Sequence, residues 1–304
     1  YRTLQKITQN VILIWIGVGI LITNITLIAL TFHALTEVTV TFFLSLFIYC
    51  LFKYNKDNNQ SYFSSMIVFL LVLMALVKPA FYSTFLFILP ILIYRNFKKK
   101  INSTWSWLLL LLALSPLLIQ LQIVQQRTGD WTISKIGTYT FDLYLLPQGI
   151  QTIENVARDK AIMRVKSMDS NLKKSYILSH LPTYCKLFVK NIWINLGAKS
   201  HYLEPQLNSK QFLRKSMRII NKSYRIFHIV FIIPVFILLW DLFKKKQFET
   251  LFVLGIPVFL FYFYLITTGI SFWEGDRLVL PIIALWIPIY CFVLDYLPGL
   301  RSNN

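Results

Sequence analysis

The densest group of charged side chains between two apolar stretches consists of Glu274, Asp276 and Arg277, within residues 272–281. Charges at the mouth of a membrane span must be paired, hydrated or functional, because burying an isolated charge in lipid is costly. An arginine there can bind phosphate oxygens through its planar guanidinium. Glu274 or Asp276 can orient that arginine or act as an acid or base. The alternative is a surface ion pair in which Asp276 caps the next helix.

A second polar group, His33, Thr36 and Glu37, interrupts the first apolar block. We interpret it as a tight turn between two spans, with Glu37 as a candidate catalytic carboxylate and His33 as an accessory residue. The alternative is that Thr36 caps a helix and Glu37 accepts hydrogen bonds from the free backbone N–H groups of its first turn.

Lys78 precedes Pro79 in the middle of the second apolar block. Proline ends or kinks a helix, and a lysine at the bilayer centre is costly, so we predict two short spans that meet here. Lys78 then either extends toward the lipid headgroups or binds the phosphate of a lipid-linked substrate.

Two further residues are weaker candidates. Asp130 follows a span and is either a carboxylate base or part of an ordinary Gly-Asp turn. His180 is interpreted as a structural loop histidine. The scattered histidines and three cysteines have no metal-ligand spacing, so we predict no metal site and no disulfide framework.

These residues are set among apolar blocks of membrane-span length. The chain of 304 residues is 56% hydrophobic, with a mean hydropathy of +0.57, which is more apolar than an ordinary soluble domain. Its net charge of +18 lies in loops that flank the apolar blocks and in one long loop. That placement suits anionic headgroups or lipid-linked phosphates, and it excludes nucleic acid as the expected partner.

The apolar pattern predicts an all-α, polytopic membrane protein with about eight transmembrane helices. Residues 10–52 and residues 62–94 each hold two spans, which meet at the polar interruptions described above. The other four spans are predicted at residues 105–123, 227–243, 251–268 and 278–297. The predicted organisation is spans in residues 1–123, a loop region in residues 124–224 and spans in residues 225–304.

Lys and Arg in the short loops predict the orientation. If the N-terminus is cytoplasmic, every basic cluster in a short loop or terminus falls on the cytoplasmic side, as the positive-inside rule requires. These clusters are Arg2 with Lys6, Lys53 with Lys56, residues 95–100, residues 244–246, and Arg301. Both termini are then cytoplasmic, and the candidate site residues share the extracytoplasmic side with the long loop.

The long loop contains two basic amphipathic stretches, residues 183–196 and residues 211–225, separated by a loop at residues 197–205. Apolar and aromatic residues recur in them together with Lys and Arg. This pattern predicts two helices that lie in the membrane interface.

Taken in order, four motifs resemble the GT-C superfamily of membrane glycosyltransferases. The closest group is that of the protein-mannosyltransferases, aminoarabinose transferases and related bacterial lipid-linked-sugar transferases. The group commonly shows a Glu after a small residue, Arg/Lys-Pro, a His-Pro-x-x-Tyr-like turn and Gly-Asp-Arg-x-x-x-Pro. The matching stretches here are Thr36-Glu37, Leu76-Val-Lys-Pro79, Ser179-His-Leu-Pro-Thr-Tyr184 and Gly275-Asp-Arg-Leu-Val-Leu-Pro281.

The resemblance implies an enzyme that moves a sugar from a polyprenyl-phosphate donor to a glycan, lipid or protein acceptor. The reaction is expected on the extracytoplasmic face of a bacterial inner or plasma membrane, without a divalent metal. Such a transfer needs cations at the leaving phosphate and a carboxylate that deprotonates the acceptor hydroxyl. The implied catalytic residues are Glu37, Glu274 and Asp276, the phosphate-binding residues are Lys78 and Arg277, and the accessory residues are His33, Asp130, His180 and Tyr184.

The resemblance departs from the family at its beginning. The catalytic aspartate of the family lies in a first outer loop, which this sequence does not show after its opening at Tyr1. Either the chain lacks its N-terminal part, which we expect, or it is a non-catalytic GT-C-like subunit. The third reading is a flippase or transporter for a lipid-linked saccharide. Against it, Asp241 and Asp295 are almost the only acids within the apolar blocks.

Overall fold

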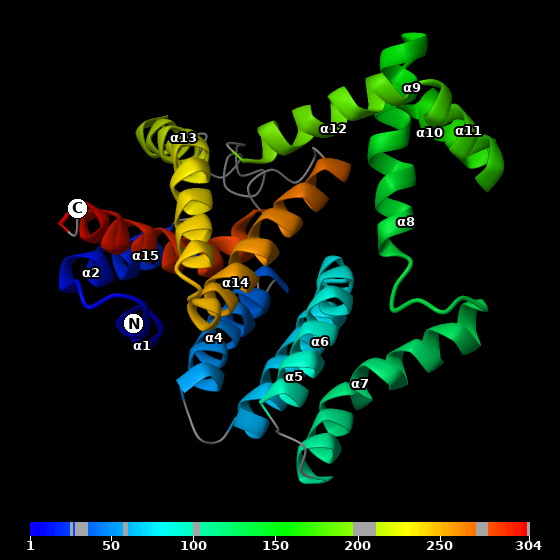
Figure 1. The fold of residues 1–304 in the computed structure, drawn as a ribbon. Helices are drawn as coiled ribbons and strands as arrows, with labels where there is room; N and C mark the ends of the chain where they lie inside the picture. The colour runs from blue at the N-terminus through cyan, green and yellow to red at the C-terminus, as the bar shows by residue number, and fades with distance from the viewer. Residues whose placement is uncertain are drawn as a thin grey trace. The chain divides into compact units, whose positions relative to one another are not determined.

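The computed structural model describes residues 1–24, 27, 36–56, 60–99, 104–196, 211–271 and 279–302. All regular elements in these ranges are helices, which confirms the predicted all-α class (Figure 1). The chain divides into two compact units. The first unit comprises Tyr1–Ile133, Ile226–Tyr264 and Leu280–Asn304, and the second comprises Ser134–Arg225 and Leu265–Val279.

The first unit is built from long apolar helices. They are α1 (Arg2–Ile7), α2 (Val11–Thr23), α4 (Thr36–Lys56), α5 (Gln60–Val77), α6 (Ala80–Lys98), α7 (Thr104–Thr128), most of α13 (Gln211–Lys244) and of α14 (Phe248–Thr267), η4 (Leu280–Ile282) and α15 (Ile283–Ser302).

Six helices of the described chain are long and apolar enough to cross a membrane. They are Thr36–Asn55, Gln60–Val77, Ala80–Lys98, Thr104–Thr128, Lys222–Lys244 and Phe248–Ile270. The protein is therefore a polytopic membrane protein. The two outermost of the eight predicted spans correspond to shorter apolar helices, Val11–Ile22 and Leu280–Tyr296. A spanning helix needs about 20 residues, so the count of eight stays a prediction.

Local sequence accounts for where these helices begin and end. The Asn10 side chain caps α2 by accepting hydrogen bonds from the N–H groups of Ile12 and Leu13, at 3.0 and 3.3 Å. The chain breaks between α5 and α6 at Lys78–Pro79, as predicted, because proline has no N–H to continue the helix. Pro116 lies inside α7, which continues to Thr128.

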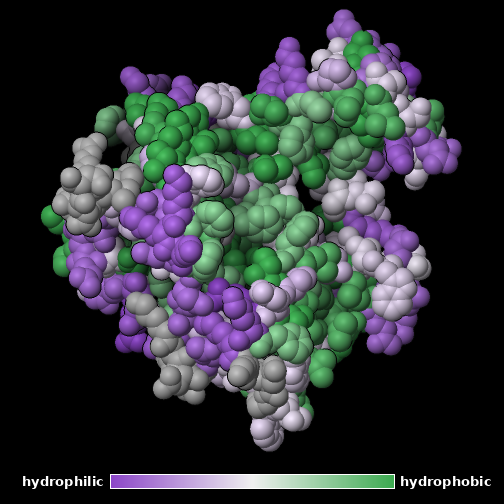
Figure 2. Space-filling view, in the orientation of Figure 1, coloured by the Kyte–Doolittle hydropathy of each residue, from purple (hydrophilic) through white to green (hydrophobic). Residues whose placement is uncertain are grey.

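The helices α4, α5 and α6 pack through buried apolar side chains such as Phe47, Ile67 and Phe81. Other large apolar side chains stay exposed, including Leu111 at 62% and Ile233 at 68%. Apolar side chains also cover much of the visible surface in Figure 2. Exposed apolar surface of this extent is expected of helices that face lipid.

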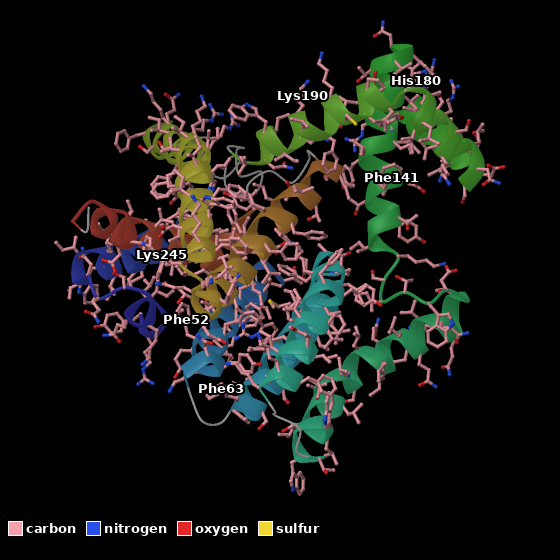
Figure 3. The ribbon with its side chains drawn as sticks, viewed as in Figure 1. Phe52, Phe63, Phe141, His180, Lys190 and Lys245 are labelled. Atoms are coloured by element: carbon pink, nitrogen blue, oxygen red, sulfur yellow. The ribbon has the colours of Figure 1, made fainter. Side chains whose placement is uncertain are left out.

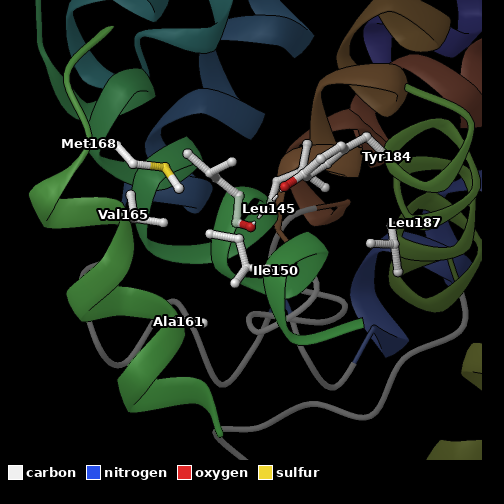
Figure 4. Packing of buried hydrophobic residues seen from close by; sticks show 8 residues of the cluster. Leu145, Ile150, Ala161, Val165, Met168, Tyr184 and Leu187 are labelled. Carbon is white, nitrogen blue, oxygen red and sulfur yellow. Dashed lines mark hydrogen bonds between the residues drawn. The ribbon is translucent and has the colours of Figure 1, made fainter. Parts of the chain in front are cut away.

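The second unit contains shorter helices around a core of its own. Its elements are α8 (Ile136–Thr140), the π-helix η1 (Phe141–Leu145), α9 (Leu146–Glu154), α10 (Arg158–Ser167), α11 (Ser170–Ser179), α12 (Leu181–Asn195), the start of α13, and η2 (Thr268–Ile270). The buried core comprises Leu145, Leu146, Ile150, Ala161, Val165, Met168, Tyr184 and Leu187 (Figure 4). The region predicted as a long loop is thus largely folded.

One prediction for this region is wrong in its boundary. Residues 183–196 correspond to α12, but residues 211–225 do not form a separate helix. They are the first part of α13, which continues without a break to Lys244. Gln211 to Ile233 contains neither glycine nor proline, so the helix that starts at Gln211 propagates into the apolar span.

The core of the second unit gives a direct stability test at Gly149 of α9. A Cβ atom there would lie 2.2 Å from the Tyr184 ring, so Gly149→Ala should force the ring out of its position. We expect the free energy of unfolding to fall by about 1–3 kcal/mol, measured by denaturant titration in detergent. Gly137→Ala in α8 is the matched control, because nothing lies within 4 Å of its added Cβ. Equal effects of the two substitutions would contradict the packing described.

Candidate functional site

The structure brings together two of the predicted site residues, Glu37 and Lys78. Glu37 lies in the first turn of α4 and is 2% exposed. Its Oε1 atom lies 3.3 Å from the Nζ atom of Lys78, and its Oε2 atom accepts a hydrogen bond of 3.3 Å from the Thr36 hydroxyl. The two residues form an ion pair that is largely shielded from water.

Two aromatic residues complete this cluster. The Nζ atom of Lys78 lies 5.6 Å from the centre of the Tyr264 ring, which belongs to the last turns of α14. Tyr264 is buried and stacks on Phe81 of α6, with ring centres 4.8 Å apart. A cation beside an aromatic ring is attracted to it, more strongly where water is excluded. We call Glu37, Lys78, Tyr264 and Phe81 the Glu37–Lys78 cluster.

Helix ends bring these residues to one place. Helix α4 begins at Thr36, and the positive end of its dipole favours the anionic Glu37. Helix α5 ends at Val77 and α6 begins at Ala80, so Lys78 lies in the turn between them. Tyr264 lies near the C-terminal end of α14, and this end of the helix reaches Lys78. The alternating directions of these helices therefore place the cluster at one end of the first unit.

The surroundings of Lys78 favour its charged form. Burial by itself lowers the pKa of Lys78, but the adjacent Tyr264 hydroxyl and the Glu37 carboxylate together raise this pKa above its ordinary value. Lys78 is therefore a permanent cation. The site holds a cation that can bind an anionic oxygen and a carboxylate that can accept a proton. In the structure these two groups are paired with each other.

Two of the predicted accessory residues, His180 and Tyr184, belong to the second unit. His180 lies at the end of α11 (Figure 3), and its Nδ1 atom is 3.0 Å from both the Tyr176 carbonyl and the Ser179 hydroxyl. Tyr184 is a core residue, whose hydroxyl donates a hydrogen bond of 3.2 Å to the Leu146 carbonyl. Both side chains make contacts local to the second unit.

Asp130 lies in the turn that follows α7 and is exposed. Its backbone N–H donates a hydrogen bond of 3.4 Å to the Thr128 hydroxyl, and Gly129 has a φ of +77°. A positive φ at glycine is typical of a turn. This geometry fits the Gly-Asp turn that was the alternative to a catalytic role.

The remaining predicted site residues lie outside the described residues. They are His33, Glu274, Asp276 and Arg277. Within the described ranges, no group of three or more His, Cys, Asp or Glu side chains is arranged to hold a metal ion. The absence of a metal stays a prediction.

Sequence reasoning missed one buried histidine. His228 of α13 is 4% exposed, and its Nδ1 atom lies 3.0 Å from the Tyr290 hydroxyl of α15. The Trp286 ring stands at 85° to it, with centres 5.4 Å apart. An ionisable residue inside an apolar span was a signal that could have found it. Tyr264 carried no comparable signal, because it is one of several aromatic residues in its span.

Comparisons of the chain with protein-family models, with curated proteins and with solved structures find no match. The GT-C resemblance thus rests on the four motifs, and the structural support for a function comes from the geometry of the Glu37–Lys78 cluster.

Removing one charge of the Glu37–Lys78 pair is expected to destabilise the fold more than removing both charges. Lys78→Met leaves the buried Glu37 carboxylate without this cation, so the free energy of unfolding should fall by about 3–5 kcal/mol. Adding Glu37→Gln removes the charge as well and should restore most of that loss. Both effects are measured by denaturant unfolding in detergent micelles.

Arg164→Met is the control for that series, because the Arg164–Glu154 pair is about half exposed on its arginine side. Exposed pairs contribute about 0–1 kcal/mol. A double variant that is no more stable than Lys78→Met would show that the two charges do not stabilise each other.

Proposed function

We propose that the protein is a membrane-embedded glycosyltransferase of the GT-C type. It would transfer a sugar from a polyprenyl-phosphate donor to a glycan, lipid or protein acceptor on the extracytoplasmic face of a bacterial plasma membrane. The single observation that carries the proposal is the buried ion pair of Glu37 and Lys78, located where three helix ends meet in the first unit. Intramembrane ionisable residues are most often functional.

The chemistry of the proposed reaction requires both members of this pair. The bond between the sugar carbon and the phosphate oxygen breaks, and the polyprenyl phosphate leaves with the bonding electrons. Lys78 stabilises the charge on that phosphate, and Arg277 is the proposed second cation. The acceptor oxygen forms the new bond to the sugar carbon, and its proton passes to a carboxylate. Glu37 is the proposed base, with Glu274 and Asp276 as the alternatives.

The pairing of Glu37 with Lys78 suggests how the donor would activate the site. When a donor phosphate binds to Lys78, the cation is shared and the Glu37 carboxylate loses part of its stabilisation. A carboxylate in a buried site with a weakened counter-charge has a higher affinity for protons. Donor binding would thus turn a resting ion pair into a competent base.

The charge and surface of the second unit support a place at the membrane interface. Its described residues contain fourteen Lys and Arg against four Asp and Glu. On α12, Lys186, Val189, Lys190 and Trp193 are all exposed, and Lys190 is marked in Figure 3. A helix face that mixes basic and apolar side chains suits anionic headgroups. We propose that α12 lies in the interface on the extracytoplasmic side, with eight spans in total and both termini cytoplasmic.

The flippase alternative has less support. Asp241 accepts a hydrogen bond of 2.5 Å from the Tyr296 hydroxyl and lies 2.9 Å from the Nζ atom of Lys245. Asp295 accepts a hydrogen bond of 2.7 Å from the Thr8 hydroxyl. Both acids are engaged in contacts near helix ends, which does not favour a relay of charges through the spans.

The proposed function is tested by transfer in membranes. Lys78→Ala should lower transfer of a radiolabelled hexose from synthetic polyprenyl-phosphate hexose by at least about 100-fold, because one cation at the leaving phosphate is lost. Arg277→Ala should do the same, and Lys174→Ala, at an exposed position of α11, should leave transfer unchanged. Unchanged transfer in the first two variants would overturn the phosphate-binding roles.

Liposomes reconstituted without an acceptor separate the two functions. A flippase would move the labelled lipid across the bilayer there, whereas the proposed transferase would leave its distribution unchanged. Movement of the lipid without any sugar transfer would replace the glycosyltransferase proposal with the flippase.

Cys185 on α12 tests the proposed orientation. It is exposed, whereas Cys50 in α4 and Cys291 in α15 are buried. A membrane-impermeant maleimide should therefore label the native chain at Cys185, and only from the extracytoplasmic side of cells or right-side-out vesicles. Cys185→Ser is the control that should abolish labelling. Labelling from the cytoplasmic side alone, in inside-out vesicles, would contradict the proposed orientation and support the opposite one.

A further inference from the structure

The end of the first unit opposite to the Glu37–Lys78 cluster carries two cations against one carboxylate. Arg95 of α6 pairs with Glu249 in the first turn of α14, and the Nζ atom of Lys99 lies 3.5 Å from the same carboxylate. The side chains of Arg95 and Lys99 are 13% and 19% exposed, whereas that of Glu249 is 55% exposed. Within the described ranges no other acid pairs with either cation. Both cations are therefore largely withdrawn from water, and one carboxylate does not neutralise them.

Aromatic rings hold the two cations in place. The guanidinium carbon of Arg95 lies 3.7 Å from the centre of the Phe252 ring, and the Nζ atom of Lys99 lies 4.9 Å from the centre of the Tyr54 ring. The two rings are neighbours, with centres 6.1 Å apart. A cation over an aromatic face is attracted to it, more strongly where water is excluded. We call Arg95, Lys99, Phe252 and Tyr54 the Arg95–Lys99 site.

A buried chain of hydrogen bonds anchors this site to three helices. The Tyr54 hydroxyl of α4 donates to the Oδ1 atom of Asn96 of α6 at 2.9 Å, and the Nδ2 atom of Asn96 donates to the Ser64 hydroxyl of α5 at 2.7 Å. All three side chains are buried. A ligand that binds to groups already held in place loses less of its affinity to ordering them. The Arg95–Lys99 site is preorganised in this sense.

The two cations lack negative charge. A guanidinium group has several N–H donors, but the buried Nε atom of Arg95 has no hydrogen-bond partner in the described part of the chain. Burial lowers the pKa of Lys99 below its ordinary value. Glu249 raises this pKa and Arg95 lowers it further, so that the carboxylate does not compensate for burial. A further anion beside the two cations would supply what Glu249 alone does not.

Exposed aromatic residues place this end of the helices at the level of lipid headgroups. Tyr94 of α6 and Trp105 at the start of α7 are 66% and 74% exposed. Phe97 and Trp107 connect the same two helix ends, with ring centres 5.2 Å apart. Exposed Tyr and Trp near the ends of spanning helices are typical of the membrane interface. The candidate span Ala80–Lys98 ends here as well, so the site lies where a span meets the headgroups.

We propose that the Arg95–Lys99 site binds the phosphate group of an anionic membrane lipid. The phosphate lies against the guanidinium and the ammonium group, because arginine binds phosphate oxygens through its planar fork and lysine binds them as a point charge. The position at a span end favours a lipid over a soluble phosphate. In the proposed orientation this end faces the cytoplasm, where the leaflet carries anionic lipids. The inference does not depend on sugar transfer.

Glu249 competes with the lipid for the same two cations. Its side chain is half exposed and can be hydrated when the phosphate takes its place. The positive end of the α14 dipole stabilises a negative charge in this first turn, whether it belongs to Glu249 or to the lipid. Removing the charge of Glu249 should therefore tighten lipid binding, which a merely structural ion pair would not do.

The test counts the lipids that bind to the whole protein in a non-ionic detergent, by native mass spectrometry. The probe is dioleoyl phosphatidylglycerol, and the comparison lipid is dioleoyl phosphatidylcholine, whose phosphate is balanced by a positive choline. Lys99→Met and Glu249→Gln change the site. The matched control is Lys244→Met, because Lys244 is an exposed lysine that also lies beside an aromatic ring, 5.3 Å from the centre of Trp240.

We expect phosphatidylglycerol to bind at least about fivefold more tightly than phosphatidylcholine. Lys99→Met should weaken its binding about fivefold, the contribution of one basic residue beside an anionic surface, and Lys244→Met should leave it unchanged. Glu249→Gln should tighten binding by about the same factor. A gain in affinity does not arise from partial unfolding, so this variant decides the question even if Lys99→Met disturbs the packing.

Several results would overturn the proposed site. Equal binding of the two lipids would show that it does not recognise negative charge, and equal losses in Lys99→Met and Lys244→Met would show only a general attraction to positive charge. No gain in Glu249→Gln would show that the carboxylate and the lipid do not share the cations. Displacement of the lipid by inorganic phosphate, but not by potassium chloride of equal ionic strength, would assign the cations to a soluble phosphate instead.

Discussion

A carboxylate that is 2% exposed among apolar helices has to have a cation beside it, and the first unit is arranged around that requirement. Glu37 and Lys78 are 41 residues apart and meet at 3.3 Å. For this to happen, α4 must begin where α5 ends, and the turn at Lys78–Pro79 must face Glu37. Tyr264 adds the end of α14 to the same place. The ion pair thus constrains the directions and relative heights of four helices.

At the opposite end of the same helices, polar side chains are likewise paired with one another. Tyr54 donates to Asn96, Asn96 donates to Ser64, and Arg95 pairs with Glu249. Between the two polar ends the helices are apolar and bind each other through packing. This distribution follows from the cost of leaving polar groups unpaired in lipid. Because the polar residues lie at the helix ends, the Glu37–Lys78 cluster does not interrupt the apolar packing in the middle of the helices.

Much of the first unit was predictable because membrane spans are long, apolar and interrupted by few charges. The break at Lys78–Pro79 was correct, since proline and a buried cation act there together. The break expected before the sixth span was wrong, because residues 211–225 contain nothing that stops a helix. Asn191 and Asn195 of α12 gave no signal at all: they donate hydrogen bonds to the carbonyls of residues 268–271, and contacts with distant backbone carbonyls leave no pattern of residue types. His228 differs, because an ionisable residue inside an apolar span is itself a signal; only its partner Tyr290 leaves no pattern in the sequence.

An ion pair of this kind can serve folding and the proposed chemistry at once, because its energy depends on the presence of both charges. Removing one charge from a buried pair costs far more than removing both. A donor phosphate brings new negative charge to Lys78, so the cation need not be lost for its bond to Glu37 to weaken. The glutamate can then become neutral by accepting a proton, and a neutral carboxyl group is tolerated in an apolar site. Proton transfer from an acceptor hydroxyl would thus relieve the imbalance that donor binding creates.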